Sequence, residues 1–382
     1  MPPPDFVPQE LSGPAHQLFG KSPGTAITRE TQLMKRKVLA SSVAVIALCL
    51  ALPVLAASGG LVVGDDSATI VQTGEANGQA SQSQPGGYGN TATITQSSGS
   101  GDQATQQQNR QGFAPVAAVG GGTTWDMAGG GTETIAQTTN TNAVASQEDN
   151  TWDSTQTITQ TNNAISSATQ TINASASYVS QANTQSATQT GNSRSGIAQT
   201  IGLNALNTTS TAAQNGQSAA QTNQNGSSIQ QVVDGDTALN NKQTAEQTNG
   251  SSNAITQQAL SNGTGNTQSA SIDYGNGNTI GQTQNGGVGN TQTASVTGGN
   301  SNNVSQYQGI GGSGNVQTAY VSSSSNGTIQ QTQANGVSSG TQTAYQLNTY
   351  GANQIYQTQS TSGNVATVTQ SFGSGNVAIQ KQ

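Results

Sequence analysis

Two short sequence phrases alternate along the last third of this chain, and each places its characteristic residues at every second position. The first phrase reads Asn-x-Gln-x-Ala-x-Ile at 266–272, and the second reads Asn-x-Ile-x-Gln-x-Gln at 278–284. A period of two is typical of a β-strand, in which every second side chain points to the same face. The Gln of the first phrase recurs at spacings of 24, 25 and 25 residues, at Gln268, Gln292, Gln317 and Gln342. This constant spacing indicates structural repeats that stack on one another.

Segments rich in Gly, Asn and Ser separate the phrases, as at 274–277 and 309–314, and such residues favour turns. Each repeat is therefore expected to form a strand, a turn, a second strand and a second turn. Two short strands cannot bury a face alone, but repeats stacked about 4.8 Å apart pair every backbone with the repeats on either side. The sequence predicts an all-β fold: a two-sided β-solenoid of stacked ~25-residue strand-turn-strand-turn repeats with cross-β pairing.

Many side chains on the inward faces of such a solenoid are amides, and buried amides need hydrogen-bond partners. Identical Gln and Asn side chains in successive repeats can stack as ladders, in which each amide donates to one neighbour and accepts from the other. Ala, Val and Ile would then fill the space between the two faces. The residues expected to form these Asn/Gln ladders and to carry assembly are Asn266, Gln268, Gln282, Gln284, Asn290, Gln292, Gln306, Gln308, Asn315, Gln317, Gln331, Gln333, Gln357, Gln359, Asn364, Gln370, Asn376 and Gln380.

The composition excludes a conventional core. Hydrophobic residues make up 31% of the 382 residues, which is too few for two packed layers of ordinary secondary structure. Charged residues make up only 7%. A secreted, disordered Gln/Asn-rich matrix polymer is an alternative with this composition. Because a disordered chain has no need for constant spacing, the repeats favour the solenoid.

Residues that carry catalytic or metal chemistry are scarce. The one His and the one Cys, His16 and Cys49, lie before residue 57, and the acidic residues do not recur at the repeat spacing. We therefore expect no enzyme activity, no cofactor and no metal. Only four of the nine basic residues lie beyond residue 56, so binding to nucleic acid is not expected.

A targeting segment precedes the repeats. Three basic residues, 35–37, follow Met34 and lead into the mostly apolar stretch 38–52, which ends near the small residues Ala56 and Ala57. This pattern predicts a secretory signal peptide over 34–56 with cleavage near Ala56, and the apolar stretch is short for a membrane span. The mature protein is then expected outside the cell, extracellular or on the cell surface, with no membrane segment, and 1–33 is expected to be an unstructured upstream extension.

The repeats divide the remaining chain into four segments of different regularity. We expect N-terminal repeats over 57–111 and a Gly-rich insertion or linker over 112–154. Degenerate Gln/Asn/Thr repeats are expected over 155–262, and regular repeats over 263–382.

Several phrases resemble the repeat of a known family. Residues 90–96 and 364–370 are similar to the Asn-x-Ala-x-x-x-Gln half of the curlin repeat of bacterial curli subunits. Residues 370–378 resemble its Gln-x-Gly-x-Gly-Asn-x-Ala turn, with one extra residue before the first Gly. The resemblance implies an exported subunit that leaves the cell through an outer-membrane curli-type pore, meets a nucleator and polymerises with itself, head to tail, as a functional amyloid. Such fibres would serve adhesion and aggregation at the cell surface or in a biofilm matrix.

Two outward-facing features suggest other functions. A run of Thr at every second position, over 155–161, could form the flat face of an ice-binding solenoid if Thr recurred in register over many repeats. Tyr320 and Tyr345 are 25 residues apart and are expected at equivalent outward positions. They are expected to stabilise the stack as an aromatic ladder, and surface adhesion is the alternative.

Overall fold

The computed structural model describes residues 67–74, 76–83, 90–108, 116–117, 123–124, 131–150, 154–173, 180–202, 212–235 and 238–382. Every regular element in these ranges is a β-strand, and no helix occurs in them. The upstream extension expected at 1–33 and the signal peptide expected at 34–56 lie outside the described residues.

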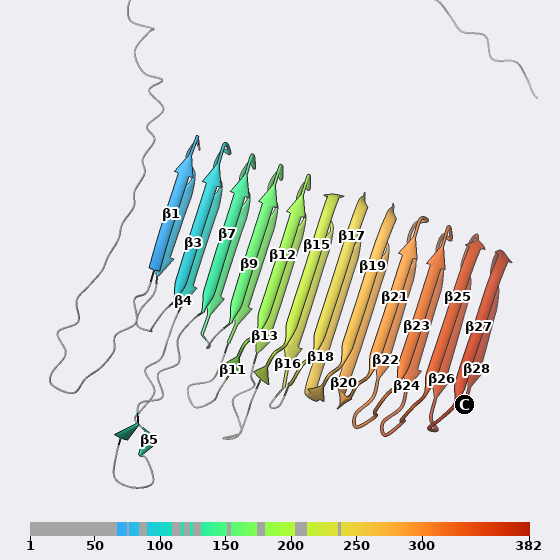
Figure 1. The fold of residues 1–382 in the computed structure, drawn as a ribbon. Helices are drawn as coiled ribbons and strands as arrows, with labels where there is room; N and C mark the ends of the chain where they lie inside the picture. The colour runs from blue at the N-terminus through green and yellow to red at the C-terminus, as the bar shows by residue number, and fades with distance from the viewer. Residues whose placement is uncertain are drawn as a thin grey trace, which may run out of the picture. The chain divides into compact units, whose positions relative to one another are not determined.

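Two parallel sheets of twelve strands each run through the described chain in sequence order (Figure 1). We call them sheet I and sheet II. A rung is one strand of sheet I together with the next strand of sheet II along the chain, such as β1 with β2. Sheet I consists of β1 (Ser67–Thr73), β3 (Thr91–Ser97), β7 (Thr132–Thr138), β9 (Thr155–Thr161), β12 (Thr184–Thr190), β15 (Gly216–Asn225), β17 (Lys242–Ser251), β19 (Thr267–Asn276), β21 (Thr291–Thr297), β23 (Val316–Ser322), β25 (Thr341–Thr349) and β27 (Val365–Gly373).

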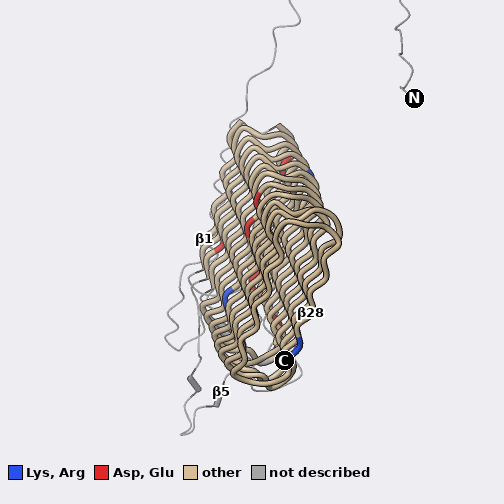
Figure 2. Tube along the Cα trace, turned by 90° about the vertical axis from the view of Figure 1, so that its right-hand side faces the viewer, with Lys and Arg blue, Asp and Glu red and all other residues tan. Residues whose placement is uncertain are grey.

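Sheet II consists of β2 (Gln79–Ser83), β4 (Gln103–Gln108), β8 (Val144–Asp149), β10 (Ser167–Ile172), β13 (Gly196–Gly202), β16 (Ser228–Asp234), β18 (Ala254–Thr264), β20 (Thr279–Val288), β22 (Asn303–Gln308), β24 (Thr328–Gln333), β26 (Gln354–Gln359) and β28 (Val377–Lys381). Two minor pairs lie outside these sheets: antiparallel β5 (Val116–Ala117) with β6 (Thr123–Thr124), and parallel β11 (Ser180–Gln181) with β14 (Ala212–Ala213). Figure 2 shows the turns of the chain one behind another between β1 and β28. The predicted two-sided β-solenoid is confirmed.

The strands pair so that equivalent repeat positions lie directly above one another. Between β19 and β21, Gln268 pairs with Gln292 and Ala270 pairs with Ala294. These residues are buried, and their neighbours along each strand are at least partly exposed, as the period of two predicts. We number the buried side chains of each strand as its first, second and third inward positions.

The turns that lead from sheet I to sheet II each contain residues in the left-handed backbone region. In three successive turns one such position holds Gly277, Ser301 and Asn326, with φ of 66°, 56° and 55°. Gly and Asn tolerate this region best, which explains why the segments between the phrases are rich in them. The same position holds Ile165, with φ of 53°, although β-branched residues strongly disfavour such a conformation.

Replacing Ile165 with Asn is expected to stabilise the solenoid by about 1 kcal/mol, because a left-handed conformation costs a side chain with a branched Cβ about 1–2 kcal/mol. The Ile165 side chain is 57% exposed, so little packing is lost. A urea titration followed by far-UV circular dichroism should show a higher midpoint with an unchanged slope. The reverse change at the equivalent position of the preceding rung, Asn142→Ile, should lower the midpoint.

The apolar core is a narrow column in which large and small side chains are complementary between the sheets. In the rung of β3 and β4, Ile94 of sheet I accompanies Ala104 of sheet II. From β12 and β13 to β25 and β26 the order is reversed, as where Ala187 accompanies Ile197. In β27 and β28 the first order returns, with Val368 in sheet I and Ala378 in sheet II. One branched and one small side chain in each rung keep the filled volume similar along the stack, as close packing requires.

One expected boundary is wrong. Residues 132–149 fall within the insertion or linker expected over 112–154, but β7 and β8 form a rung paired on both sides. The pattern was missed because Glu133 occupies the first inward position, where neighbouring rungs have Ala or Gln. The departure from the stack therefore falls between β4 and β7. Within 155–262, the strands β9, β10, β12, β13 and β15 to β18 continue the same two sheets.

Candidate functional site: amide ladders and terminal edges

An uninterrupted Gln ladder runs through sheet II at the second inward position of all twelve strands. Each Nε2 donates to the Oε1 of the Gln in the following rung, with distances of 2.7–3.2 Å. The ladder consists of Gln82, Gln106, Gln147, Gln170, Gln199, Gln231, Gln257, Gln282, Gln306, Gln331, Gln357 and Gln380. These hydrogen bonds run along the stack and hold successive rungs in register.

The same amides also join the two sheets. Nε2 of Gln282 donates to the backbone oxygen of Ser269 at 3.0 Å, and Nε2 of Gln306 donates to that of Thr293 at 3.0 Å. Gln282 and Gln306 are 0% and 1% exposed. Each buried amide therefore has both of its N–H groups satisfied, one along the stack and one across it.

Sheet I carries shorter ladders at two positions. At its first inward position, a ladder runs from Gln156 to Gln342. At its third inward position, a ladder runs from Gln72 to Gln247 and is then interrupted by apolar residues before Gln346 and Gln370. Sheet II has a further ladder from Gln284 to Gln382. All Gln residues expected in the ladders lie in one of these four columns.

Asn side chains also link the rungs, and Nδ2 of Asn302 donates to Oδ1 of Asn278 at 3.1 Å as a ladder requires. Several of the expected Asn residues bond to the backbone instead. Oδ1 of Asn266 accepts from the backbone N–H of Asn290 at 3.0 Å, and Nδ2 of Asn266 donates to the backbone oxygen of Gly287 at 3.2 Å. Asn290 and Asn315 repeat this arrangement. The Asn side chain thus links rungs through the turn backbone, because it is one methylene shorter than Gln and lies where the strand begins.

The last described rung holds its predicted ladder residues less firmly. Asn364 is half-buried and donates to Thr361, and Asn376 is exposed. Gln370 and Gln380 accept amide hydrogen bonds from the preceding rung. Sequence reasoning missed the ladder members between Gln82 and Gln257, because few of these strands follow a complete Asn phrase. The signal that could have found them is a Gln at every repeat on the same strand face.

The first and last described rungs present matching edges. No described strand pairs with the outer edge of β1, β2, β27 or β28. The inward residues of the last rung are Ala366, Val368 and Gln370 in sheet I, with Ala378 and Gln380 in sheet II. Those of the first rung, at the same positions, are Ala68, Ile70 and Gln72, with Ala80 and Gln82. The preceding rung differs, since it has Gln342, Ala344 and Ile355 at three of these positions.

The ladders also have a direction. Every Gln Nε2 donates toward the C-terminal rungs, so the Oε1 atoms face the β1–β2 end and the N–H groups face the β27–β28 end. If β27 and β28 of one copy met β1 and β2 of another, Gln370 would donate to Gln72 and Gln380 to Gln82. The contact would continue two ladders with their direction unchanged.

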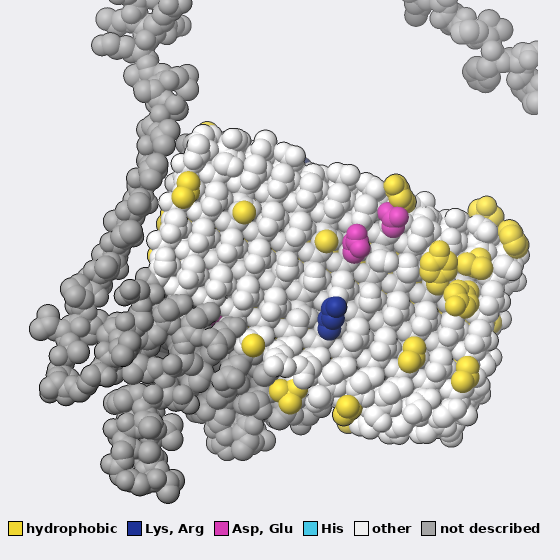
Figure 3. Space-filling model, in the orientation of Figure 1, with side chains coloured by type: hydrophobic (Ala, Val, Ile, Leu, Met, Phe, Trp, Pro, Cys, Tyr) yellow, Lys and Arg dark blue, Asp and Glu magenta, His cyan; other side chains and the backbone are white. Residues whose placement is uncertain are grey.

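The outer face of sheet I is flat, polar and nearly free of charge (Figure 3). Between β3 and β12 its outward rows are almost entirely Thr and Ser in register. They consist of Thr91, Thr132, Thr155 and Thr184; Thr93, Thr134, Thr157 and Ser186; Thr95, Ala136, Thr159 and Thr188; and Ser97, Thr138, Thr161 and Thr190. Tyr320 and Tyr345 are neighbours on the same face, with ring centres 6.3 Å apart in an edge-on arrangement.

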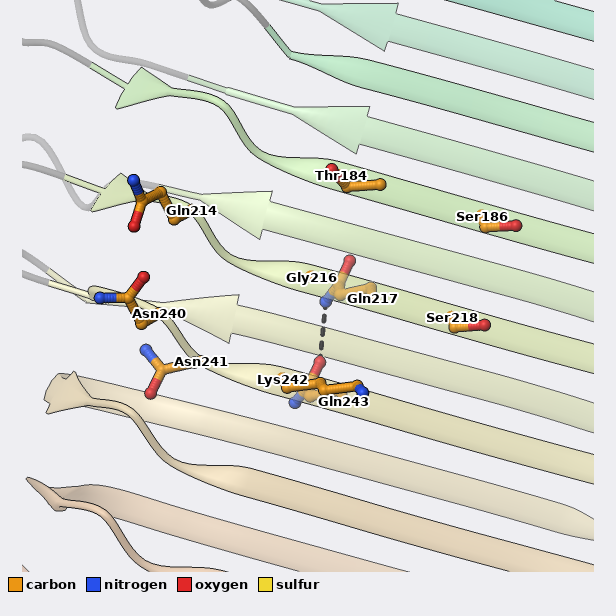
Figure 4. Close-up of a pocket in the computed structure, with 10 residues that line it drawn as sticks. All are labelled: Thr184, Ser186, Gln214, Gly216, Gln217, Ser218, Asn240, Asn241, Lys242 and Gln243. Carbon is orange, nitrogen blue, oxygen red and sulfur yellow. Dashed lines mark hydrogen bonds between the residues drawn. The ribbon is translucent and has the colours of Figure 1, made fainter.

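A shallow hollow lies on this face (Figure 4). It lies where Gly216, which has no side chain, occupies the row between Thr184 and Lys242. Lys242 is the one charged residue of its lining, and below it Gln217 donates to Gln243 at 2.8 Å. Among the described residues, no three or more His, Cys, Asp or Glu side chains are grouped so that they could hold a metal ion.

Comparisons with known proteins add no family assignment. A scan against models of protein families and a search of curated proteins found no match to this chain. Within the ranges that the structure describes, no helix is long and apolar enough to cross a membrane.

Proposed function

We propose that this chain is a secreted structural protein that assembles with itself, head to tail, into curli-like amyloid fibres of a bacterial surface or biofilm matrix. The observation that carries the proposal is the match between the inward residues of the first and last described rungs. Val368 would stack on Ile70, and Gln380 would donate to Gln82.

The geometry of such a contact leads to fibres. The β27–β28 edge and the β1–β2 edge are different surfaces, so their contact is heterologous and leaves one free edge of each kind on every assembly. Each added copy would extend both sheets by parallel pairing at the strand spacing of about 4.8 Å. This is the cross-β arrangement of amyloid.

The export and partner assignments rest on the sequence. A signal peptide over 34–56 and the curlin-like phrases support passage through a curli-type outer-membrane pore and contact with a nucleator. N-terminal sequencing of extracellular protein is expected to begin close to residue 57. Extracellular protein that begins at residue 1 or at Met34 would contradict the assigned signal peptide.

Cysteine cross-linking tests the head-to-tail contact. In the proposed register, Thr369 of one copy lies beside Val71 of the next on the outer face, about 4.8 Å away between Cα atoms, a separation that a disulfide can bridge. The mature chain has no Cys of its own. Fibres of the double variant Thr369→Cys with Val71→Cys should yield a series of covalent oligomers on oxidation.

The controls use the same chemistry at positions that the contact does not bring together. Each single variant should give dimers at most, and Thr369→Cys with Thr159→Cys should give no long series. A series of equal yield from this control pair, or none from the Val71 pair in mature fibres, would contradict the head-to-tail arrangement.

A second function is favoured by the outer face of sheet I. Its rows of hydroxyl and methyl groups between β3 and β12 repeat regularly in two directions, about 4.8 Å between strands and about 7 Å along them. A rigid, uncharged surface of this kind can order water in a matching lattice, so ice binding is the alternative. We expect the purified chain to inhibit ice recrystallisation if this face binds ice. Thr134→Lys with Thr157→Lys should abolish the inhibition, and Thr343→Lys should preserve it.

A further inference from the structure

Glu133 is an acid inside an amide ladder. It occupies the first inward position of β7, between Ala92 of β3 and Gln156 of β9. The side chain is 0% exposed, and neither carboxyl oxygen has a hydrogen-bond partner. An ionised carboxylate buried without partners is very unfavourable.

Gln156 lacks the donor that the other members of its ladder have. Its Nε2 donates to Oε1 of Gln185 at 2.9 Å and to the backbone oxygen of Glu148 at 3.1 Å. Its own Oε1 is buried and accepts no hydrogen bond. In this ladder each later Oε1 accepts from the rung before it, and the residue before Gln156 in the column is Glu133. Two unpaired groups therefore occupy adjacent places in one ladder, and a single proton would join them.

The surroundings of Glu133 disfavour its ionised form. The neighbouring strands β3, β4, β9 and β10 contain no Asp, Glu, Lys or Arg. The strand β8 contributes the acids Asp149 and Glu148. Burial first, then Asp149 and Glu148, raise the pKa of Glu133 to about 9. A basic residue that could compensate a carboxylate is absent from these strands.

We propose that Glu133 is a proton-binding residue whose protonated carboxyl donates to Oε1 of Gln156, and that this makes the junction between β7 and β9 the pH-sensitive joint of the solenoid. With the proton, the ladder gains one member and the buried charge disappears. Without it, two acceptors oppose each other inside the core. The joint separates the rungs of β1 to β8 from the long run of rungs that begins with β9 and β10.

Two other ladders provide an internal comparison. Oε1 of Gln284 and Oε1 of Gln346 are also buried without a donor. The residues that precede them in their columns are Ala259 and Val321, which have no polar hydrogen on their side chains. Of the three ladder starts, only the one at Gln156 lies next to a side chain that can supply a proton.

The linkage predicts less stability at higher pH. The folded chain retains a proton that the unfolded chain releases above the ordinary Glu value of 4.5, so folding becomes less favourable as pH rises from there to about 9. In the middle of this window the unfolding constant should rise about tenfold per pH unit, and above about 9 this contribution should level off. Glu133→Gln should remove this component, because an amide supplies the donor at every pH.

The experiment compares the full chain with Glu133→Gln and Glu133→Ala in urea titrations between pH 5 and pH 10. We expect both variants to lose the pH-dependent component, and Glu133→Gln to be the more stable because it completes the ladder. Burial also raises the pKa of Asp102, although the hydrogen bond that it accepts from the backbone N–H of Ala143 lowers it in part. The variant Asp102→Asn therefore serves as the control that retains the Glu133 component.

Infrared spectroscopy supplies a direct measurement. The native chain should show the C=O stretch of a protonated carboxyl at pH 7, and Glu133→Gln should lose intensity there, with the band titrating near pH 9 in the parent. A variant spectrum identical to the parent at pH 7, or an unchanged pH dependence of unfolding in Glu133→Gln, would overturn the proposal.

Discussion

Replacing Ile379 with Pro is expected to slow fibre elongation about tenfold or more while leaving the solenoid folded. At the two ends of β28, the backbone oxygen of Asn376 and the backbone N–H of Gln382 form hydrogen bonds with β26. In a parallel sheet, the backbone groups of successive residues form hydrogen bonds alternately with the strand on one side and the strand on the other. The N–H of Ile379 therefore points away from β26, toward the position of the next copy. Pro removes this donor and places its ring in the contact, without breaking a hydrogen bond inside the chain.

Seeded growth followed by light scattering measures this effect. Ile379→Thr is the matched control, because it retains the N–H at a side chain that is already 66% exposed. The control should elongate at the parent rate, and both variants should show the parent far-UV spectrum before seeding. Growth of the Pro variant at the parent rate would mean that elongation does not use this edge.

The strand pattern and the repeat spacing were sufficient to predict the two-sided solenoid. Once Gln268 and Gln292 are placed on one face in successive repeats, parallel pairing in register is the arrangement that satisfies both amides. The column of Gln in sheet II follows from the same reasoning, and the structure extends it to Gln82.

Other features depend on details that a repeat pattern does not contain. The rung of β7 and β8 does not follow from the phrases because Glu133 stands where the neighbouring strands have Ala92 and Gln156. Burial, and after it Asp149 and Glu148, raise the pKa of Glu133 only once the stack has formed. The role of Asn266 was also not predictable from the phrase. Whether an amide meets another amide or the backbone depends on the length of the side chain and on where the turn begins.

Replacing Gln282, Gln306 and Gln331 together with Ala should strongly destabilise the described core. Each substitution removes hydrogen bonds along and across the stack, and backbone oxygens such as that of Ser269 lose their amide donor. A lost pairing that leaves a buried partner unsatisfied costs about 1–3 kcal/mol, so the free energy of unfolding should fall by at least about 3 kcal/mol. Urea unfolding of the unassembled chain measures this loss, and seeded elongation should slow with it.

The matched control changes three outward neighbours of the same strands, Thr283, Ser305 and Thr332, to Ala. These side chains are partly exposed or exposed, and they belong to none of the ladders, so the free energy of unfolding should change by about 0.5 kcal/mol or less for each. Both triple variants remove polar groups from the same three rungs, one from the inward face and the other from the outward face. A ladder variant as stable as this control would contradict the prediction, because the amide column would then contribute nothing of its own to the stability of sheet II.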